Sequence, residues 1–231
     1  MTKTKQKILF LFLVCFSIYC ALAIGQSWDE EFLVSQGRIT LNYLLSLGRI
    51  DVDLHLREYY SPIYYSLKFL LTQIFPISYR IEASHLINLI FSLSAIIAIK
   101  KLSKELFNEN VGNYVFLILF FYPIFFGHMA FNSKDTIAAF SHVWIFYLSI
   151  KYLKKQNIEL KAKNYINFIA VLAALSVGIN LLFLGSLIPI FLFLLIDIFF
   201  LKKFICETFS KKKFLIDIIK VFVIFYFLLI I

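Results

Sequence analysis

Charged residues and cysteines are both scarce in this sequence, and each scarcity excludes a class of protein. Aspartate, glutamate, lysine and arginine make up 16% of the 231 residues, whereas hydrophobic residues make up 61%. A soluble domain averages about 25% charged and roughly 45–50% apolar residues. An apolar excess of this size cannot be buried inside one globule, so lipid must be the solvent for much of the surface. The composition therefore predicts an integral membrane protein.

Features that would cross-link the chain or divide it into domains are also missing from the sequence. The three cysteines do not form the set that a disulfide framework requires. There is no internal repeat of about 20–50 residues and no low-complexity linker. We therefore expect one membrane domain over residues 1–231. Whether this domain is the N-terminal part of a longer protein stays open.

Long apolar runs predict seven membrane-spanning helices. A spanning helix needs about 20 mostly apolar residues, with about 17 as the minimum. The run at 166–200 is too long for one helix and is interrupted by GINLLFLGS and Pro189, so we interpret it as two spans with a turn near 178–186. The predicted fold class is all-α and polytopic. The runs cover residues 8–25, 81–99, 111–127, 136–152, 166–200 and 214–231.

The distribution of basic residues gives these spans an orientation. Sixteen of the 23 lysines and arginines lie before the first span or after the second, fourth and sixth, which places them on one side. All four arginines lie on the other side. Because basic residues are enriched in cytoplasmic loops, we expect the N-terminus to be cytoplasmic. Anchoring to a lipid bilayer explains the net charge of +9, so nucleic acid is not an expected partner.

The segment SPIYYSLKFLLTQIFP at 61–76 predicts a helix that lies on the membrane and does not cross it. Ser61 suits an N-cap, and Pro76 suits the end of a helix. About 14 residues at 1.5 Å each extend roughly 21 Å, which is shorter than the ~30 Å hydrocarbon core. We expect amphipathic helices in this first outer loop. The apolar residues that share one face of this helix are Ile63, Leu67, Leu70, Leu71 and Ile74.

The first apolar run has two interpretations. It is either a retained span or, with the basic KTKQK before it and Ala21–Ala23 near its end, a cleavable signal peptide. We expect it to be retained, because the acidic residues that follow it need an anchor near the membrane interface.

Ionisable residues gather in the two outer loops and beside them. Carboxylates can act as general bases, while lysine, arginine and histidine can stabilise an anionic phosphate. Chemistry that joins a lipid-anchored phosphate to a polar acceptor at the outer interface needs both kinds of group. The candidates are Asp29 and Glu30 after the first span, Arg57 in DVDLHLRE, His85 in the second span, and His128, Asn132, Lys134 and Asp135 in FFGHMAFNSKDT.

Structural roles are the alternative for several of these residues. Ser27 to Glu30 fits the S-x-x-E pattern of a capping box, in which acidic residues favour the first turn of a helix. Lys134 and Asp135 could likewise form an ion pair that caps the fourth span.

An acidic pair after the first span, a surface helix and the motif GH-x-x-x-N-x-KD at 127–135 together resemble a known family. This family comprises the polyprenyl-phosphate-sugar-dependent glycosyltransferases of GT-C fold, which include the dolichyl-phosphate-mannose protein mannosyltransferases. The similarity covers about residues 28–152, including EYYSPIYYSLKFLLTQIF and EASHLINLIFSLSAIIAIKKLSKELF. The chain departs from the family at Ser133, where the family has proline, and at Ser84, where it has arginine. It also lacks the family's arginine after the fifth span.

The resemblance implies inverting sugar transfer from a polyprenyl-phosphate carrier to an acceptor that is a glycan, a lipid or a protein. The site would lie on the extracytoplasmic face of a bacterial inner membrane. The resemblance leaves the need for a divalent metal open. It implies Asp29 as general base, Glu30 as its support and Asp135 as a second acid, with Lys134 binding the carrier phosphate and His128, Asn132, Arg57 and His85 completing the substrate-binding set.

Two other classes of function remain as alternatives. A polytopic transporter of lipids or solutes would place ionisable residues at mid-bilayer and show inverted repeats, whereas here nearly all lie at the edges of outer loops. A truncated, non-catalytic membrane protein would need none of the outer-loop chemistry.

Overall fold

The computed structural model describes residues 3–49, 63–158 and 162–230. Within these ranges the chain is helical and contains no strand, so the predicted all-α class is confirmed. Two short helical segments, Ile77–Tyr79 and Asp197–Leu201, precede α4 and follow α9. The α-helices are α1 (Lys3–Ala23), α2 (Glu30–Leu45), α3 (Ile63–Thr72), α4 (Arg80–Leu106), α5 (Glu109–Phe121), α6 (Pro123–His128), α7 (Asp135–Lys155), α8 (Ala162–Val177), α9 (Phe183–Ile196) and α10 (Lys211–Ile230).

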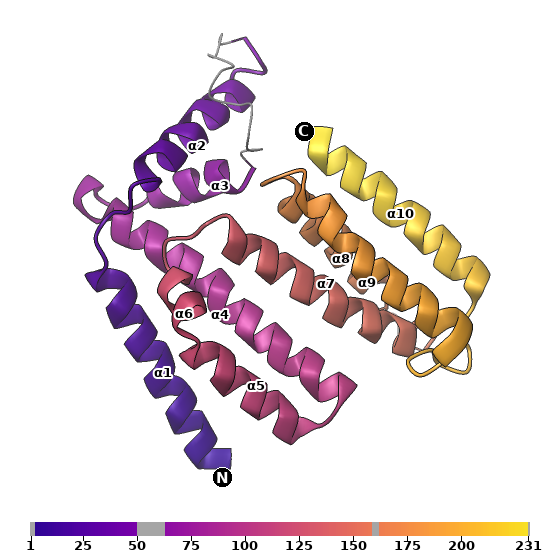
Figure 1. The fold of residues 1–231 in the computed structure, drawn as a ribbon. Coiled ribbons are helices and arrows are strands. Elements are labelled where there is room, and N and C mark those ends of the chain that lie inside the picture. Colours follow the sequence, from indigo (N-terminus) through magenta and orange to yellow (C-terminus); the bar gives the residue numbers. More distant parts are fainter. Residues whose placement is uncertain (1–2, 50–62, 159–161, 231) are drawn as a thin grey trace.

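The longer helices lie side by side and alternate in direction, while α2 and α3 sit together at one end of the bundle (Figure 1). We call this end, with the connections at 24–29, 73–79, 129–134 and 178–182, the α2–α3 end. The connections at 107–108 and 202–210 and residues 156–158 lie at the opposite end, together with the start of α1 (Figure 1). We call that end the lysine-rich end, because α4 and α7 finish there and α10 begins there with lysines.

Three helical stretches, Ile77–Leu106, Asp135–Lys155 and Phe183–Leu201, are long and apolar enough to cross a membrane. Shorter apolar helices cover Lys7–Ala23, Glu109–Phe121 and Ala162–Val177. Each of the six predicted apolar runs is therefore helical over most of its length, but seven crossings stay a prediction.

The predicted third span, 111–127, is divided in the structure. Helix α5 ends at Phe121, Tyr122 has an extended backbone, and α6 begins at Pro123. Proline has no backbone N–H to donate within a helix and disfavours helical geometry in the residue before it, so the break falls where the sequence requires it. The predicted turn within 166–200 is confirmed, since α8 ends at Val177 and α9 begins at Phe183.

Helix α4 is the centre of one half of the bundle, where it contacts α1, α5 and α7. A buried cluster that includes Leu13, Leu89, Ile96 and Phe120 joins α1, α4 and α5. In the other half, α7 packs against α8 and α8 against α10. Separate buried apolar clusters therefore join neighbouring helices and support the connections at the α2–α3 end.

Helix α3 turns its polar face towards the protein and its apolar face outwards. Tyr64, Tyr65 and Lys68 are buried, whereas Leu67 and Leu70 are 43% and 50% exposed. A soluble helix has the opposite arrangement. The arrangement agrees with the amphipathic helix predicted for this segment, although α3 ends at Thr72 and residues 61–62 lie outside the described ranges.

Helices α2 and α3 approach each other closely at Gly37. A Cβ atom at this position would lie 2.3 Å from the backbone oxygen of Tyr65, a distance that real Cβ atoms do not show. We expect Gly37→Ala to lower the thermal unfolding midpoint in detergent, although alanine favours a helix over glycine by about 1 kcal/mol. Gly185→Ala in α9 is the matched control, because nothing lies within 4 Å of its added Cβ. A Gly37→Ala protein at least as stable as Gly185→Ala would contradict this packing.

Candidate functional site at the α2–α3 end

The connection between α6 and α7 is organised by Asn132. Its side-chain oxygen accepts the backbone N–H groups of Lys134 and Asp135 at 3.2 and 3.1 Å, and its amide donates to the Asp135 carboxylate at 3.0 Å. The same amide lies 3.2 Å from Nδ1 of His128. The GH-x-x-x-N-x-KD motif therefore forms a hydrogen-bonded turn that starts α7, which is a structural role for Asn132.

Asn88 of α4 holds this turn against the helix bundle. Its side-chain amide is fully buried and donates to the backbone oxygens of Met129 and Asn132 and to the Thr136 hydroxyl, at 3.0–3.2 Å. Its side-chain oxygen accepts from the Tyr64 hydroxyl of α3 at 3.1 Å. Asn88 thus joins α3, α4 and the turn. The sequence contained a signal for it, because an asparagine inside an apolar span usually has buried partners.

Glu30 and His85 form a buried pair at the start of α2. Nε2 of His85 lies 2.8 Å from one Glu30 oxygen, and its Nδ1 lies 3.1 Å from the Ala21 backbone oxygen. The second Glu30 oxygen accepts the Ser27 N–H at 2.7 Å, which is half of the predicted capping box. The pair therefore locks the end of α1 and the start of α2 onto α4.

The pKa of Glu30 results from opposing effects. Burial raises the pKa of this carboxyl, but the hydrogen bonds from His85 and Ser27 and the nearby charges of His85 and Lys68 together hold it below its usual value. Glu30 is therefore ionised at neutral pH, and both of its oxygens already have partners. A carboxylate in this state positions its neighbours and does not take a proton from a substrate.

Asp29 and Lys134 form the accessible part of the site. The Lys134 ammonium lies 3.9 Å from the Asp29 carboxylate, and the two side chains are 26% and 61% exposed. They come from segments about a hundred residues apart, one before α2 and one before α7. Asp29 precedes α2 without a side-chain capping bond. A base and a cation at this distance can act on opposite sides of one small reacting group.

Lys68 lies beneath this pair and was not among the predicted site residues. It is 2% exposed, and its ammonium donates to the Ser133 hydroxyl at 2.8 Å. Burial lowers the pKa of Lys68 to about 8, although the Glu30 charge acts in the opposite direction. Ser133 stands where the resembled family has proline, so this hydrogen bond depends on a departure from the family pattern.

The lowered pKa of Lys68 predicts how stability depends on pH. Between about pH 8 and 10.5 the folded protein holds fewer protons at this amine than the unfolded chain, so stability rises with pH in that window. Each pH unit is worth at most about 1.4 kcal/mol. Thermal unfolding of the wild type and of Lys68→Met at pH 7–10 measures this difference. We expect the thermal unfolding midpoint of the wild type to rise relative to that of the variant as pH rises. Parallel plots of the two midpoints against pH would contradict the burial of a charged Lys68.

The structure places the predicted residues at one end of the bundle but in different surroundings. Glu30 and His85 are buried, while Asp135 is exposed and His128 is half-buried at the end of α6. Arg57 lies outside the described residues, so its predicted substrate contact is not located. In the part of the chain that the structure describes, no three His, Cys, Asp or Glu side chains are grouped closely enough to hold a metal ion.

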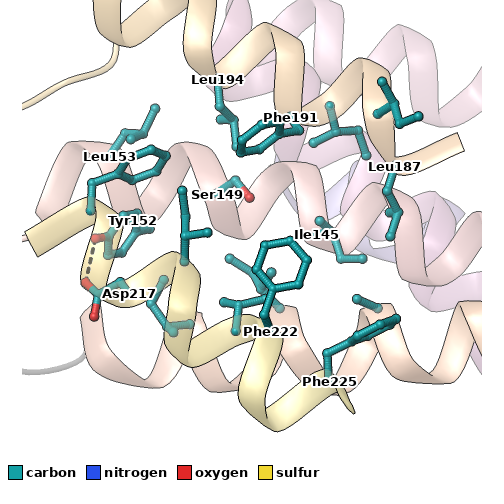
Figure 2. Close-up of a pocket in the computed structure, with 18 of the residues that line it drawn as sticks. Ile145, Ser149, Tyr152, Leu153, Leu187, Phe191, Leu194, Asp217, Phe222 and Phe225 are labelled. Atoms are coloured by element: carbon teal, nitrogen blue, oxygen red, sulfur yellow. Dashed lines mark hydrogen bonds between the residues drawn. The ribbon is translucent and has the colours of Figure 1, made fainter. Parts of the chain in front are cut away.

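A cavity lies away from this site, between α7, α8, α9 and α10 (Figure 2). We call it the apolar groove. Its volume is about 430 Å³, and its lining is almost entirely apolar, with Ile145, Phe191 and Phe222 among the side chains that point into it (Figure 2). At the lysine-rich end of this apolar groove, the Tyr152 hydroxyl donates to the Asp217 carboxylate at 2.6 Å. Apart from the Ser149 hydroxyl, the polar side chains of the lining, Tyr152 and Asp217, lie at this one end.

Comparisons of the chain with models of protein families, with curated proteins and with solved structures found no match.

Proposed function

We propose that this protein is a membrane glycosyltransferase of GT-C-like fold that transfers a sugar from a polyprenyl-phosphate carrier to a hydroxyl acceptor at the α2–α3 end. The observation that carries the proposal is the approach of Asp29 and Lys134 to 3.9 Å, from the two loops that the sequence motifs single out. The motif residues themselves provide the second support, since they build the turn that positions Lys134.

Membrane insertion, which the proposal requires, is supported by the exposed apolar surface. Large side chains such as Leu11, Ile118, Phe222 and Phe227 are each more than 60% exposed. In water this surface would cost about 25 cal/mol per Å². Lipid removes that cost, and a bilayer around α1, α5 and α10 would leave the α2–α3 end at one interface and the lysines at the other.

In the proposed reaction, Asp29 takes the proton from the acceptor hydroxyl as the acceptor oxygen attacks the anomeric carbon of the sugar. The bond between this carbon and the phosphate oxygen breaks, and the configuration at the carbon inverts. Lys134 stabilises the negative charge on the departing polyprenyl phosphate. Glu30 and His85 hold the start of α2 in place, and the apolar groove along α7–α10 offers a place for the hydrocarbon tail of the carrier.

The proposal is tested by supplying a panel of polyprenyl-phosphate sugars to the protein in nanodiscs and measuring the release of free polyprenyl phosphate. A glycosyltransferase is expected to release it with sugar transferred to a hydroxyl acceptor. A correctly folded protein that binds no carrier and releases none would instead support the non-catalytic alternative, while carrier movement between leaflets without release would support the transporter.

The distribution of lysines predicts that the α2–α3 end faces the outside of the cell and the lysine-rich end faces the cytoplasm. In a variant whose three cysteines are replaced by serine, a cysteine at Trp28, which is 97% exposed, should react with a membrane-impermeant reagent added outside the cell. A cysteine at Lys104 in the lysine-rich end should react only after the membrane is opened. Labelling of position 104 from outside would reverse the proposed orientation.

A further inference from the structure

A small cavity, mostly apolar in its lining but with several polar groups, lies between α2, α3 and the start of α4. Its volume is about 150 Å³. A water molecule occupies about 30 Å³, so the cavity has room for roughly five waters or for one phosphate group. Its polar lining includes Glu30, Glu31, Lys68, Gln73, Arg80 and Ser84.

Lys68 lines this cavity, and its ammonium has more N–H donors than acceptors among the described residues. Its ammonium has three N–H donors, and the Ser133 hydroxyl is the acceptor that it has among the described residues. A buried ammonium normally has further acceptors, because each unsatisfied donor costs free energy. The side chain of Lys68 is 2% exposed, so bulk water does not supply them.

Ser84 adds a second buried group that lacks a partner. It is 4% exposed, it lines the cavity, and its hydroxyl has no hydrogen-bond partner in the part of the chain that the structure describes. Arg80 lines the same cavity and uses its Nε–H to bond the Phe75 backbone oxygen at 3.3 Å, which leaves the other guanidinium donors for a ligand.

The Glu30 carboxylate in the lining attracts the Lys68 ammonium electrostatically but accepts no hydrogen bond from it. Both Glu30 oxygens already accept hydrogen bonds, from Ser27 and His85. Glu31 is exposed, so its charge is screened by solvent. Among the described residues, the lining therefore offers an ammonium and a guanidinium that each have further N–H donors and a hydroxyl without a partner, a set that matches a ligand with several anionic oxygens.

We propose that this cavity binds a phosphate oxyanion, with Lys68 as its main cation, the Ser84 hydroxyl as a second donor and Arg80 at its rim. The ligand is either free phosphate or the phosphate of a lipid headgroup. Since Lys68 also donates to Ser133, an oxyanion here is linked through one side chain to the turn that carries Lys134. The site does not depend on sugar transfer and is tested without it.

The test uses the full chain in detergent free of phospholipid, with inorganic phosphate titrated against chloride at equal ionic strength. Phosphate is expected to raise the thermal unfolding midpoint of the wild type in a saturable way. Lys68→Met should weaken the apparent affinity about 10- to 150-fold, the loss expected for a hydrogen bond to a charged group. Ser84→Ala should weaken it about 3- to 10-fold.

Lys104→Met is the matched control, because it removes an exposed lysine from the lysine-rich end and should leave phosphate binding unchanged. A second arm replaces phosphate by phosphatidic acid, with diacylglycerol as the lipid that lacks the phosphate. Binding of phosphatidic acid alone would identify a lipid headgroup as the ligand, and binding of inorganic phosphate would identify a free oxyanion. If neither probe binds the wild type, or if folded Lys68→Met binds as tightly as the wild type, the proposal is wrong.

Discussion

Replacing Asp29 by asparagine is expected to abolish sugar transfer while leaving carrier binding and the fold intact. Asparagine keeps the size and hydrogen bonding of the side chain but cannot accept the proton of the acceptor hydroxyl. Loss of a general base typically lowers a rate by about 10²–10⁴. Because Asp29 makes no side-chain capping bond and is 61% exposed, the substitution should change stability little.

Lys134→Ala, the companion variant, should act on a different step. It removes a cation that would contact the carrier phosphate, so carrier binding should weaken about 10- to 150-fold. Release of polyprenyl phosphate and carrier affinity, both measured in nanodiscs, separate the two effects. Unchanged turnover in Asp29→Asn would remove this residue from the mechanism. If both variants changed only stability, by about 1 kcal/mol or less, Asp29 and Lys134 would have the structural role of an ion pair between the two connections.

The second large effect is expected at Asn88, which touches neither proposed substrate. Asn88→Ala would leave the buried Tyr64 hydroxyl without its acceptor and would remove the Asn88 bonds to the Met129 and Asn132 backbone oxygens and to the Thr136 hydroxyl. A buried polar group left unsatisfied costs about 1–3 kcal/mol and each further hydrogen bond lost about 0.5–1.5 kcal/mol, so the variant should lose roughly 3 kcal/mol or more. The turn at 129–134 should then become accessible to protease.

Asn110→Ala is the control for this prediction, because Asn110 is exposed near the start of α5, at the lysine-rich end. We expect its thermal unfolding midpoint and its protease pattern to match those of the wild type. An Asn88→Ala protein as stable and as protease-resistant as Asn110→Ala would show that the Asn88 hydrogen bonds do not hold the turn.

The positions of the helices could be predicted from the sequence because their signals are local. An apolar run of 17 or more residues has few alternatives to a helix, and Pro123 and the GINLLFLGS segment mark where runs break. The extent of α2 (Glu30–Leu45) and the division of the third run went unpredicted. The division depends on Tyr122, whose extended backbone is a consequence of the proline after it.

The buried polar contacts of the site could not be predicted, because they join residues far apart in the chain. Lys68 reaches Ser133, and Glu30 reaches His85, over separations of 65 and 55 positions. Lys68 belongs to the polar side of an amphipathic helix, where a lysine is ordinarily exposed to solvent. Only the packing of α3 against α2 and α4 shows that this polar side faces inwards, away from solvent.

The structure also separates the candidate residues that a substrate can reach from those that position other parts of the protein. Asp29 and Lys134 are accessible to a substrate, whereas Glu30 and His85 bind each other inside the protein. The prediction that His85 binds substrate is therefore better restated as a positioning role, in which it holds Glu30 and the end of α1. The role of Asp135, which is exposed and hydrogen-bonded to Asn132, stays a prediction.

The most direct measurement of the central claim is photo-cross-linking with a polyprenyl-phosphate sugar that carries the photoreactive group on the sugar. The full chain in proteoliposomes is irradiated with this probe, and the labelled peptides are identified by mass spectrometry. The account predicts label on the segment before α2 and on the turn before α7, with competition by unmodified carrier. Label confined to the lysine-rich end, or label that unmodified carrier does not displace, would contradict a sugar-transfer site formed by Asp29 and Lys134.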